Sequence, residues 1–221
     1  MFSLDLNSYG LLNYWPIQNN MDDYAGGSHM IFGANNSFSS DRFNNSDSAL
    51  NFANGFNLVP SGVYFSGDFT VTLWINYNQM VDWSRILEFS NSKTDAISLY
   101  ASWSNLATPG LNIINGSSNS LNGNSVNTTF SSALQTNKWY HVAFRFCAAS
   151  AKIYVDGVLK ASAGNQLVPN NVTRTTNFIG GNSFGDAKLN AKIDELRIYK
   201  RCVSQNEIMN LMSYSNASPD L

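Results

Sequence analysis

Apolar and polar residues alternate with a period of two in two runs of the chain, DFTVTLWINY at 68–77 and WYHVAFRF at 139–146. Alternation of this kind is typical of a β-strand with one buried face. Both runs therefore predict strands. The positions expected to point into the core are Phe69, Val71, Leu73, Ile75, Tyr140, Val142, Phe144 and Phe146.

The segment after the second run predicts a pair of hairpins. AKIYV at 151–155 follows a short loop, and Asp156-Gly157 then leads into VLKAS. Asp-Gly is a strong signal for a tight hairpin turn. Short runs bounded by Gly, Asn, Ser or Asp recur along the chain and favour an all-β sandwich or barrel.

A late run, IDELRIYK at 193–200, predicts another strand with Leu196 and Ile198 inward. The same alternation places Asp194 on that inward face and Glu195 on the opposite one. No internal repeat is present, and core-forming runs continue on both sides of the polar stretch at 115–127. We therefore expect a single domain over residues 1–221, with its core at about 10–211.

One short helix is expected near the end of the chain. Ser204 and Glu207 have the spacing of a capping box, in which each side chain accepts a hydrogen bond from the backbone N–H of the other residue. The helix should cover about residues 205–213. Its apolar side chains Ile208, Leu211 and Met212 should dock on a sheet.

Composition and charge exclude several functions. Charged residues make up 13% of the chain and the formal net charge is −2, while 31 asparagines and 29 serines supply neutral polar surface. The basic surface of a nucleic-acid-binding protein is absent. No apolar stretch approaches the roughly 20 residues of a membrane span. The first residues, MFSLDLNSYG, do not read as a signal peptide, so any export signal is expected outside this chain.

Cysteines and glycosylation sequons bear on the compartment. Cys147 and Cys202 each follow a strand-like run, and both a disulfide and two unpaired buried cysteines fit their positions. Asn-x-Ser/Thr triplets are expected by chance in a chain this rich in Asn and Ser. Few charges and many aromatic residues favour an extracellular setting. The triplets begin at Asn35, Asn44, Asn115, Asn127, Asn171 and Asn216.

Eight segments occur in a characteristic order: GLLNYWPI, MDDYAGG, DRFNNSDSALNF, DFTVTLWIN, WSRILEF, NKWYHVAFRF, AKIYVDGVLKAS and IGGNSFGDAKLNAKIDELRIYKRCVSQNEI. In this order the chain resembles the laminin G-like branch of the concanavalin A-like lectin and glucanase superfamily, from about residue 10 to 211. The resemblance implies an antiparallel two-sheet jelly-roll sandwich. It also implies an extracellular recognition or adhesion module for glycans or proteins, frequently with calcium, although some relatives hydrolyse polysaccharides.

Catalytic residues for glycoside hydrolysis are not evident. The glycosidases of this superfamily carry carboxylates two residues apart on one strand, and retaining chemistry needs two carboxyl groups about 5 Å apart. None of Glu88, Glu195 and Glu207 has an acidic residue two positions away. Asp194 and Glu195 are adjacent and so are expected on opposite faces of their strand. We expect no enzymatic activity.

A structural calcium ion is implied by the resemblance, with Asp23 and Asp194 at the matching positions. Calcium prefers carboxylate and carbonyl oxygens, which a Gly-rich loop can supply. Gln18 stands where relatives commonly place Asp, which weakens the set. In the alternative, Asp194 accepts backbone hydrogen bonds from the loop at 22–27 and no ion is bound.

Outward aromatic and polar side chains are the candidate ligand surface, because a sugar packs its C–H groups on an aromatic ring and hydrogen bonds through its hydroxyls. Trp83 and Tyr100 lie in or near loops and either face solvent or cover an edge of the core. The residues proposed to bind a ligand are Trp74, Asn76, His141, Arg145, Tyr154 and Trp103.

Arg85 and Glu88, in WSRILEF, are expected to form a structural ion pair rather than to contact a ligand. Arg85 would share a face with apolar residues, so it needs a buried acceptor or a bulge. The sequence as a whole predicts a non-catalytic extracellular module that binds a glycan or a protein. The alternatives are an assembly domain of a larger surface protein with no small ligand and, third, a glycoside hydrolase.

Overall fold

The computed structural model describes residues 9–104, 107–116, 124–127 and 133–213. Over these residues the chain forms thirteen strands and the helix α1 (Gln205–Ser213). This confirms the all-β fold with one short C-terminal helix. The strands are β1 (Leu11–Trp15), β2 (Ile31–Ser39), β3 (Ala49–Val59), β4 (Phe69–Tyr77), β5 (Arg85–Ser92), β6 (Asp95–Tyr100), β7 (Gly110–Asn115), β8 (Asn124–Asn127), β9 (Trp139–Cys147), β10 (Ser150–Val155), β11 (Val158–Ala163), β12 (Thr176–Ile179) and β13 (Leu189–Tyr199).

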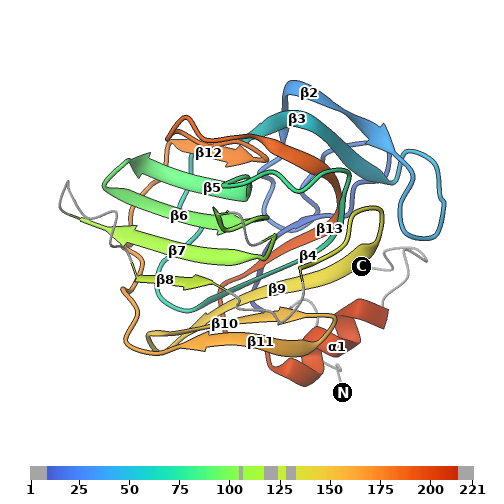
Figure 1. Ribbon diagram of the computed structural model, residues 1–221. Helices are drawn as coiled ribbons and strands as arrows, with labels where there is room; N and C mark the ends of the chain where they lie inside the picture. Colours follow the sequence, from blue (N-terminus) through green and yellow to red (C-terminus); the bar gives the residue numbers. More distant parts are fainter. Residues whose placement is uncertain (1–8, 105–106, 117–123, 128–132, 214–221) are drawn as a thin grey trace, which may run out of the picture.

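The strands pair in one continuous antiparallel path, β11-β10-β9-β4-β13-β3-β12-β5-β6-β7-β8, with β1 beside β13 and β2 beside β3. Figure 1 shows that the sheet curls over on itself, so that β8 approaches β10 and β11 at the other end of the path. The half around β4, β9 and β10 therefore faces the half around β5, β6 and β7. One apolar cluster lies between the two halves, as expected for a two-layer sandwich.

All eight apolar positions that the alternation singles out on β4 and β9 lie in this core. Strands β5, β6 and β7 supply the facing side chains. Burying one large apolar side chain stabilises the fold by about 1.5–3 kcal/mol. The face of each strand that carries these side chains therefore turns inward. The facing residues include Leu87, Phe89, Ile97, Leu99, Leu111 and Ile113.

Strand β13 carries a bulge that reverses the expected direction of Asp194. Ile193 and Leu196 both lie in the core, although strict alternation would put them on opposite faces. Glu195 is the extra residue and has a positive φ of 56°. Asp194 therefore lies opposite Trp74, on the outer face of the half-sheet that contains β4, β9 and β10. The expectation that Asp194 points inward is wrong.

Helix α1 begins at the predicted capping box. The backbone N–H of Ser204 donates to Glu207 Oε2 at 2.7 Å, and the N–H of Glu207 donates to Ser204 Oγ at 3.2 Å. Ile208 and Leu211 are buried and Met212 is half-buried, so the predicted docking face is confirmed. Within the described residues, no helix is long and apolar enough to cross a membrane.

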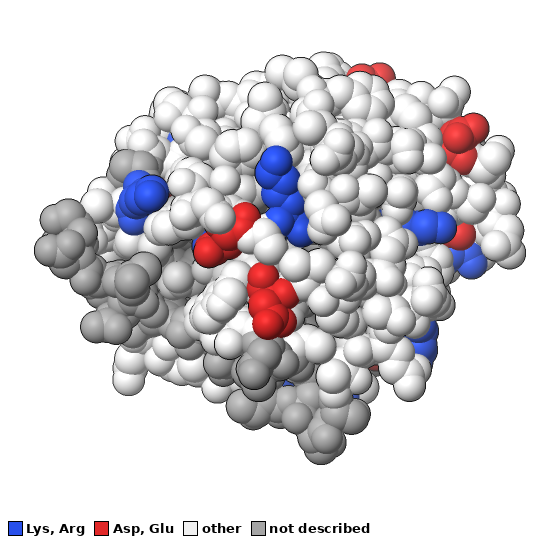
Figure 2. Space-filling model, turned by 45° about the horizontal axis from the view of Figure 1, so that its top comes forward, with Lys and Arg blue, Asp and Glu red and all other residues white. Residues whose placement is uncertain are grey.

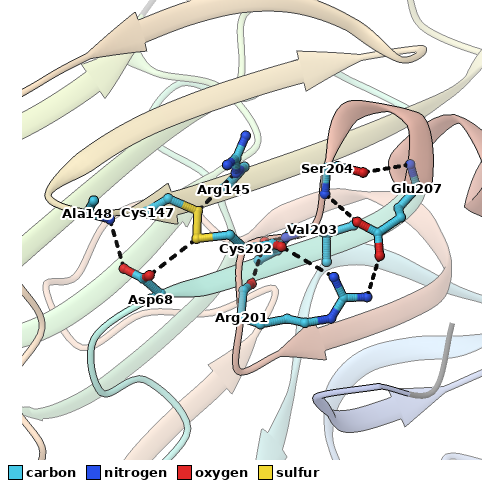
Figure 3. The surroundings of a disulfide bond; sticks show 10 residues. Asp68, Arg145, Cys147, Ala148, Arg201, Cys202, Val203, Ser204 and Glu207 are labelled. Atoms are coloured by element: carbon cyan, nitrogen blue, oxygen red, sulfur yellow. Dashed lines mark hydrogen bonds and ion pairs between the residues drawn. A yellow bond between two sulfur atoms is a disulfide. The ribbon is translucent and has the colours of Figure 1, made fainter. Parts of the chain in front are cut away.

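A disulfide joins Cys147, at the end of β9, to Cys202, between β13 and α1. This resolves the alternative that the sequence left open. Figure 3 shows the neighbouring ion pair, in which Arg201 Nη2 lies 2.8 Å from Glu207 Oε1. Helix α1 packs on the outer face of β9, β10 and β13 and covers part of it. The apolar cluster beneath and within α1 consists of Ala143, Tyr154, Tyr199, Val203, Ile208 and Leu211.

Candidate functional site

Five of the six expected ligand-binding residues share one surface, the outer face of β4, β9 and β10. Trp74 lies opposite His141, and their ring centroids are 5.4 Å apart. Asn76 and Arg145 lie on the same face of these two strands, and Tyr154 lies on the same face of β10. The sixth residue belongs to the other half of the sheet and is described below.

Much of this outer face is covered. His141 is 1% exposed and Tyr154 is 3% exposed, the latter beneath α1. Burial and the positive charges of nearby arginines lower the pKa of His141 to about 3, so its imidazole is neutral at physiological pH. Trp74 and Asn76 are half-buried. Sugar binding by this surface stays a prediction.

Asp23 organises the loop that follows β1. Burial would raise the pKa of its carboxyl, but the hydrogen bonds it accepts hold that pKa below its usual value. Gly26 allows the loop to close, since a Cβ there would lie 2.3 Å from a backbone carbonyl oxygen. The donors, 2.6–3.0 Å from the carboxylate, are the backbone N–H groups of Tyr14, Ala25, Gly26 and Ser28 and the side-chain amide of Asn13.

Asp194 is paired with an arginine. Its Oδ2 lies 2.8 Å from Arg42 Nη1, and the two side chains are 0% and 6% exposed. The guanidinium carbon of Arg42 lies 4.4 Å from the ring centroid of Phe43 and 4.7 Å from that of Trp74. Burial and the neighbouring Glu195 raise the pKa of Asp194, while Arg42 opposes the rise. The pair is therefore enclosed by aromatic rings and removed from water.

These surroundings do not suit calcium. The ion needs several oxygen ligands that are free to coordinate it, whereas both oxygens of Asp23 face N–H donors and Oδ2 of Asp194 faces a guanidinium. Among the described residues, no three His, Cys, Asp or Glu side chains are grouped so as to hold a metal. The alternative, in which the loop at 22–27 donates to Asp194, is wrong because those donors serve Asp23. Calcium binding stays a prediction, and the geometry opposes it.

We expect millimolar calcium to leave the melting temperature unchanged relative to EDTA. An ion that binds the native state raises the melting temperature by mass action. Both oxygens of Asp23 accept N–H hydrogen bonds, and Oδ2 of Asp194 faces Arg42. Differential scanning calorimetry in calcium and in EDTA measures this. A rise that is lost in Asp23→Asn would contradict the geometry and restore the calcium site.

The bulge in β13 also brings a second carboxylate to the outer face. Glu195 Oε2 is paired with Arg197 and accepts a hydrogen bond from the Tyr14 hydroxyl at 2.9 Å. The expectation that Asp194 and Glu195 point to opposite faces is therefore wrong, because the extra residue breaks the alternation. Both side chains are buried and each has its own arginine. Neither carboxylate faces solvent where a sugar would meet it.

Trp103 belongs to an aromatic group on the other half of the sheet. It packs against Trp83, which precedes β5, and Tyr100, which ends β6, with ring centroids 5.4 and 4.6 Å away. The rings of Trp83 and Tyr100 are 6.0 Å apart in an edge arrangement. Tyr100 is buried, whereas Trp83 is 40% exposed. The rings of Tyr100 and Trp103 thus support the solvent-exposed ring of Trp83.

The backbone at Trp83 has an uncommon conformation. Its φ is +61°, a left-handed value that bulky side chains rarely adopt. The turn is closed by Ser84 N–H donating to the Val81 carbonyl at 3.2 Å, and Ala101 N–H donates back to Ser84 at 2.9 Å. Such backbone persists only where its surroundings enforce it, and it is concentrated at functional sites. The exposed ring is therefore held in place by the fold.

Beneath the aromatic rings lies a network centred on Arg85. Arg85 Nε is 3.1 Å from Glu88 Oε2, Nη1 is 2.7 Å from Asp186 Oδ2, and Nη2 donates to the Tyr100 hydroxyl at 3.0 Å. The ion pair predicted between Arg85 and Glu88 is confirmed. A register shift just after Arg85 supplies the expected bulge and places both side chains on one face.

Glu88 anchors the loop that follows β12. Its Oε1 accepts hydrogen bonds from Ser183 N–H at 2.8 Å and Ser183 Oγ at 2.6 Å. Burial raises the pKa of Glu88, and Ser183 and Arg85 oppose the rise. The next residue, Phe184, lies 5.2 Å from the guanidinium carbon of Arg85. We call this surface the Trp83 patch; it comprises Trp83, Arg85, Tyr100, Trp103, Phe184 and Asp186.

Sequence reasoning found only part of the Trp83 patch. Three of its four aromatic residues, Trp83, Tyr100 and Trp103, were visible in the sequence as tryptophan or tyrosine in or near loops, whereas Phe184 was not singled out. Asp186 carried no such signal, because it is 101 residues from Arg85 in the sequence and only the curled sheet brings the two together.

Comparisons with known proteins bear on the fold. A laminin G family model, described as concanavalin A-like lectin/glucanases superfamily, matches residues 44–209, which is most of the chain. No curated protein sequence matches the chain.

Several solved structures share the fold at low identity. Domain 4 of AbnA, an extracellular GH43 arabinanase from Geobacillus stearothermophilus solved with arabinotriose, has a TM-score of 0.74 at 19% identity, over 91% of this chain and 97% of that one. The binding domain of Paraclostridial Mosquitocidal Protein 1 has a TM-score of 0.68 at 14% identity, over 93% and 52%. A Trypanosoma rangeli sialidase has 0.65 at 17%, over 92% and 32%. The chain thus spans nearly all of the first, about half of the second and a third of the sialidase, and the likeness shows the fold alone.

Proposed function

The chain belongs to the concanavalin A-like lectin/glucanases superfamily, and on that premise we propose that it is a non-catalytic extracellular module that binds a glycan through the Trp83 patch. One observation carries the proposal. Trp83 presents 40% of its surface to solvent, yet its ring is held by Tyr100 and Trp103 and its backbone by an enforced turn.

Sugar recognition needs two kinds of group on one surface. A pyranose or furanose ring packs C–H groups on an aromatic face, and its hydroxyls bond to fixed polar side chains. In the patch, Trp83 offers the aromatic face and Asp186 offers a carboxylate that Arg85 holds in place at 2.7 Å. A rigid aromatic side chain loses little conformational entropy on binding. The rigid patch is therefore better suited to binding a saccharide than a site formed by a flexible loop would be.

Absence of catalysis is part of the proposal. Glycoside hydrolysis needs two carboxyl groups that can both reach the glycosidic bond. Asp194 and Glu195 are buried beside their arginines, and Glu88 is buried beneath the Trp83 patch. These positions support a binding role.

An extracellular setting is supported by the covalent link between Cys147 and Cys202. Disulfides persist in oxidising compartments and are rare in the cytosol. The arabinanase whose domain 4 shares this fold is itself described as extracellular.

Replacing Trp83 by alanine is expected to weaken glycan binding at least about tenfold, because a central aromatic anchor commonly carries that much binding energy. A glycan array identifies the ligand for the wild type, and isothermal titration calorimetry then compares the variants. Tyr24→Ala is the matched control, since Tyr24 is 39% exposed and lies outside the patch. It should bind as the wild type does.

Two results would contradict the proposal. Equal loss of binding in Trp83→Ala and Tyr24→Ala would remove the Trp83 patch as the site. Arrays that stay blank with the wild type, together with self-association that grows with concentration, would favour an assembly domain instead. Release of reducing sugar from any bound polysaccharide would point to a hydrolase.

A further inference from the structure

We infer that the Trp83 patch selects neutral oligosaccharides and rejects acidic ones. This inference rests on the proposed function, and it concerns the chemical class of the ligand. Recognition of a sugar carboxylate, sulfate or phosphate needs a cation with free N–H donors, of which arginine is the usual source. The state of Arg85, the arginine of the patch, and the sum of the charges around Trp83 therefore bear on the ligand class.

The guanidinium of Arg85 has its donors directed into the protein. Nε faces Glu88 at 3.1 Å, Nη1 faces Asp186 at 2.7 Å, and Nη2 donates to the Tyr100 hydroxyl at 3.0 Å. The flat faces of the group are also occupied, since its central carbon lies 4.6 Å from the Tyr100 ring and 5.2 Å from the Phe184 ring. The whole residue is 3% exposed. An incoming anion meets no available guanidinium.

The charge around Trp83 does not favour an anion either. Arg85 and the exposed Lys93, which lies 5.7 Å from the Phe184 ring centroid, supply two positive charges. Glu88, Asp186 and the exposed Asp82 supply three carboxyl groups. The sum is −1 with all three ionised, and zero if the buried Glu88 holds its proton. In neither state is the surface positive.

The Asp186 carboxylate is an outward acceptor of the patch. Asp186 commits Oδ2 to Arg85, while within the described chain Oδ1 has no hydrogen-bond partner and its side chain is 37% exposed. Sugar hydroxyls can donate to such an oxygen, and acidic substituents are repelled by it. Figure 2 shows a face on which charged side chains take up little of the surface, with acidic and basic groups interspersed. No extended basic area is seen on this face.

Matched pairs of ligands test the inference. An array should carry lactose with 3′-sialyllactose and oligogalactosides with oligogalacturonides, beside other neutral and acidic oligosaccharides, and each hit should be titrated by calorimetry. We expect the neutral member of a bound pair to bind at least tenfold more tightly than its acidic counterpart. Raising the salt concentration should leave neutral binding unchanged, because no ion pair forms with the ligand.

A second variant probes the cause. Asp186→Asn keeps the shape of the side chain and removes its charge, so the ratio of neutral to acidic affinity should fall several-fold. Thermal melting of this variant checks that it is folded. Equal or tighter binding of the acidic member, with binding still lost in Trp83→Ala, would overturn the neutral selectivity and leave glycan binding intact. Absence of any hit among both classes would overturn the proposed function itself.

Discussion

Replacing Arg42 by alanine is expected to lower the free energy of unfolding by roughly 3–5 kcal/mol, the usual loss when one partner of a buried ion pair is removed. The substitution leaves the Asp194 carboxylate, 0% exposed, without the guanidinium that lies 2.8 Å away. It also removes a cation from the rings of Phe43 and Trp74. Urea unfolding followed by tryptophan fluorescence measures the change.

The loss should depend on pH with a definite sign. Burial and Glu195 raise the pKa of Asp194 in the folded state and Arg42 opposes this, so Arg42→Ala raises that pKa further. A carboxyl whose folded pKa exceeds its unfolded value, about 3.9, binds more protons when folded, and stability then falls as the pH rises from that value towards the folded pKa. The difference between variant and wild type should therefore be smaller at about pH 4 than at pH 7.

Two further variants make the Arg42 prediction specific. Asp22→Asn removes a carboxylate from an exposed pair with His29, with side chains 57% and 58% exposed, and should change stability by less than about 1 kcal/mol. Arg42→Met combined with Asp194→Asn removes both charges and should recover much of the loss. A cost below about 1 kcal/mol for Arg42→Ala, at every pH, would show that the pair contributes little.

Loss of the Cys147–Cys202 disulfide should lower the free energy of unfolding by about 4 kcal/mol, as the chain-entropy relation gives for a closed loop of this length. The two cysteines are 55 residues apart, so the crosslink removes many conformations from the unfolded chain. The bond also joins the end of β9 to the segment between β13 and α1 (Figure 3). For a chain of this size the melting temperature should fall by roughly 10 °C.

The double variant Cys147→Ala/Cys202→Ala, compared with the wild type with and without reductant, measures this effect. Reductant should lower the melting temperature of the wild type and leave the double variant unchanged, which controls for effects of reductant elsewhere. Glycan binding should persist in the folded double variant, because the Trp83 patch lies on the other half of the sheet. A loss below about 1 kcal/mol would mean that the crosslink does not restrict the unfolded state as the entropy relation assumes.

Local sequence patterns predicted those features of the fold that are determined by residues close together in the chain. The period-two runs of β4 and β9 gave the correct inward faces, because apolar burial acts on each strand separately. Ser204 and Glu207 gave the start of α1 to the residue, because a capping box is made within one turn of chain.

Alternation failed at the two bulges. In β13 the extra residue Glu195 turned Asp194 to the outer face, and in β5 a register shift after Arg85 put that residue beside Glu88. A bulge depends on pairing with another strand, so a single strand's pattern cannot place it, although the apolar neighbours of Arg85 indicated that either a bulge or a buried acceptor was needed there. The calcium hypothesis was affected for the same reason, since it relied on an inward Asp194.

By itself, the amino-acid sequence determined the strands β4, β9, β10, β11 and β13, the inward faces of β4 and β9, the capped helix, the low charge and the superfamily. Each of these follows from residues close together in the chain or from their order. Tertiary structure alone decided which polar side chains meet. The pairing of Arg85 with Asp186 spans 101 residues and that of Arg42 with Asp194 spans 152. Such contacts arise only when the sheet curls and brings distant strands and loops to one surface, and the candidate binding site depends on them.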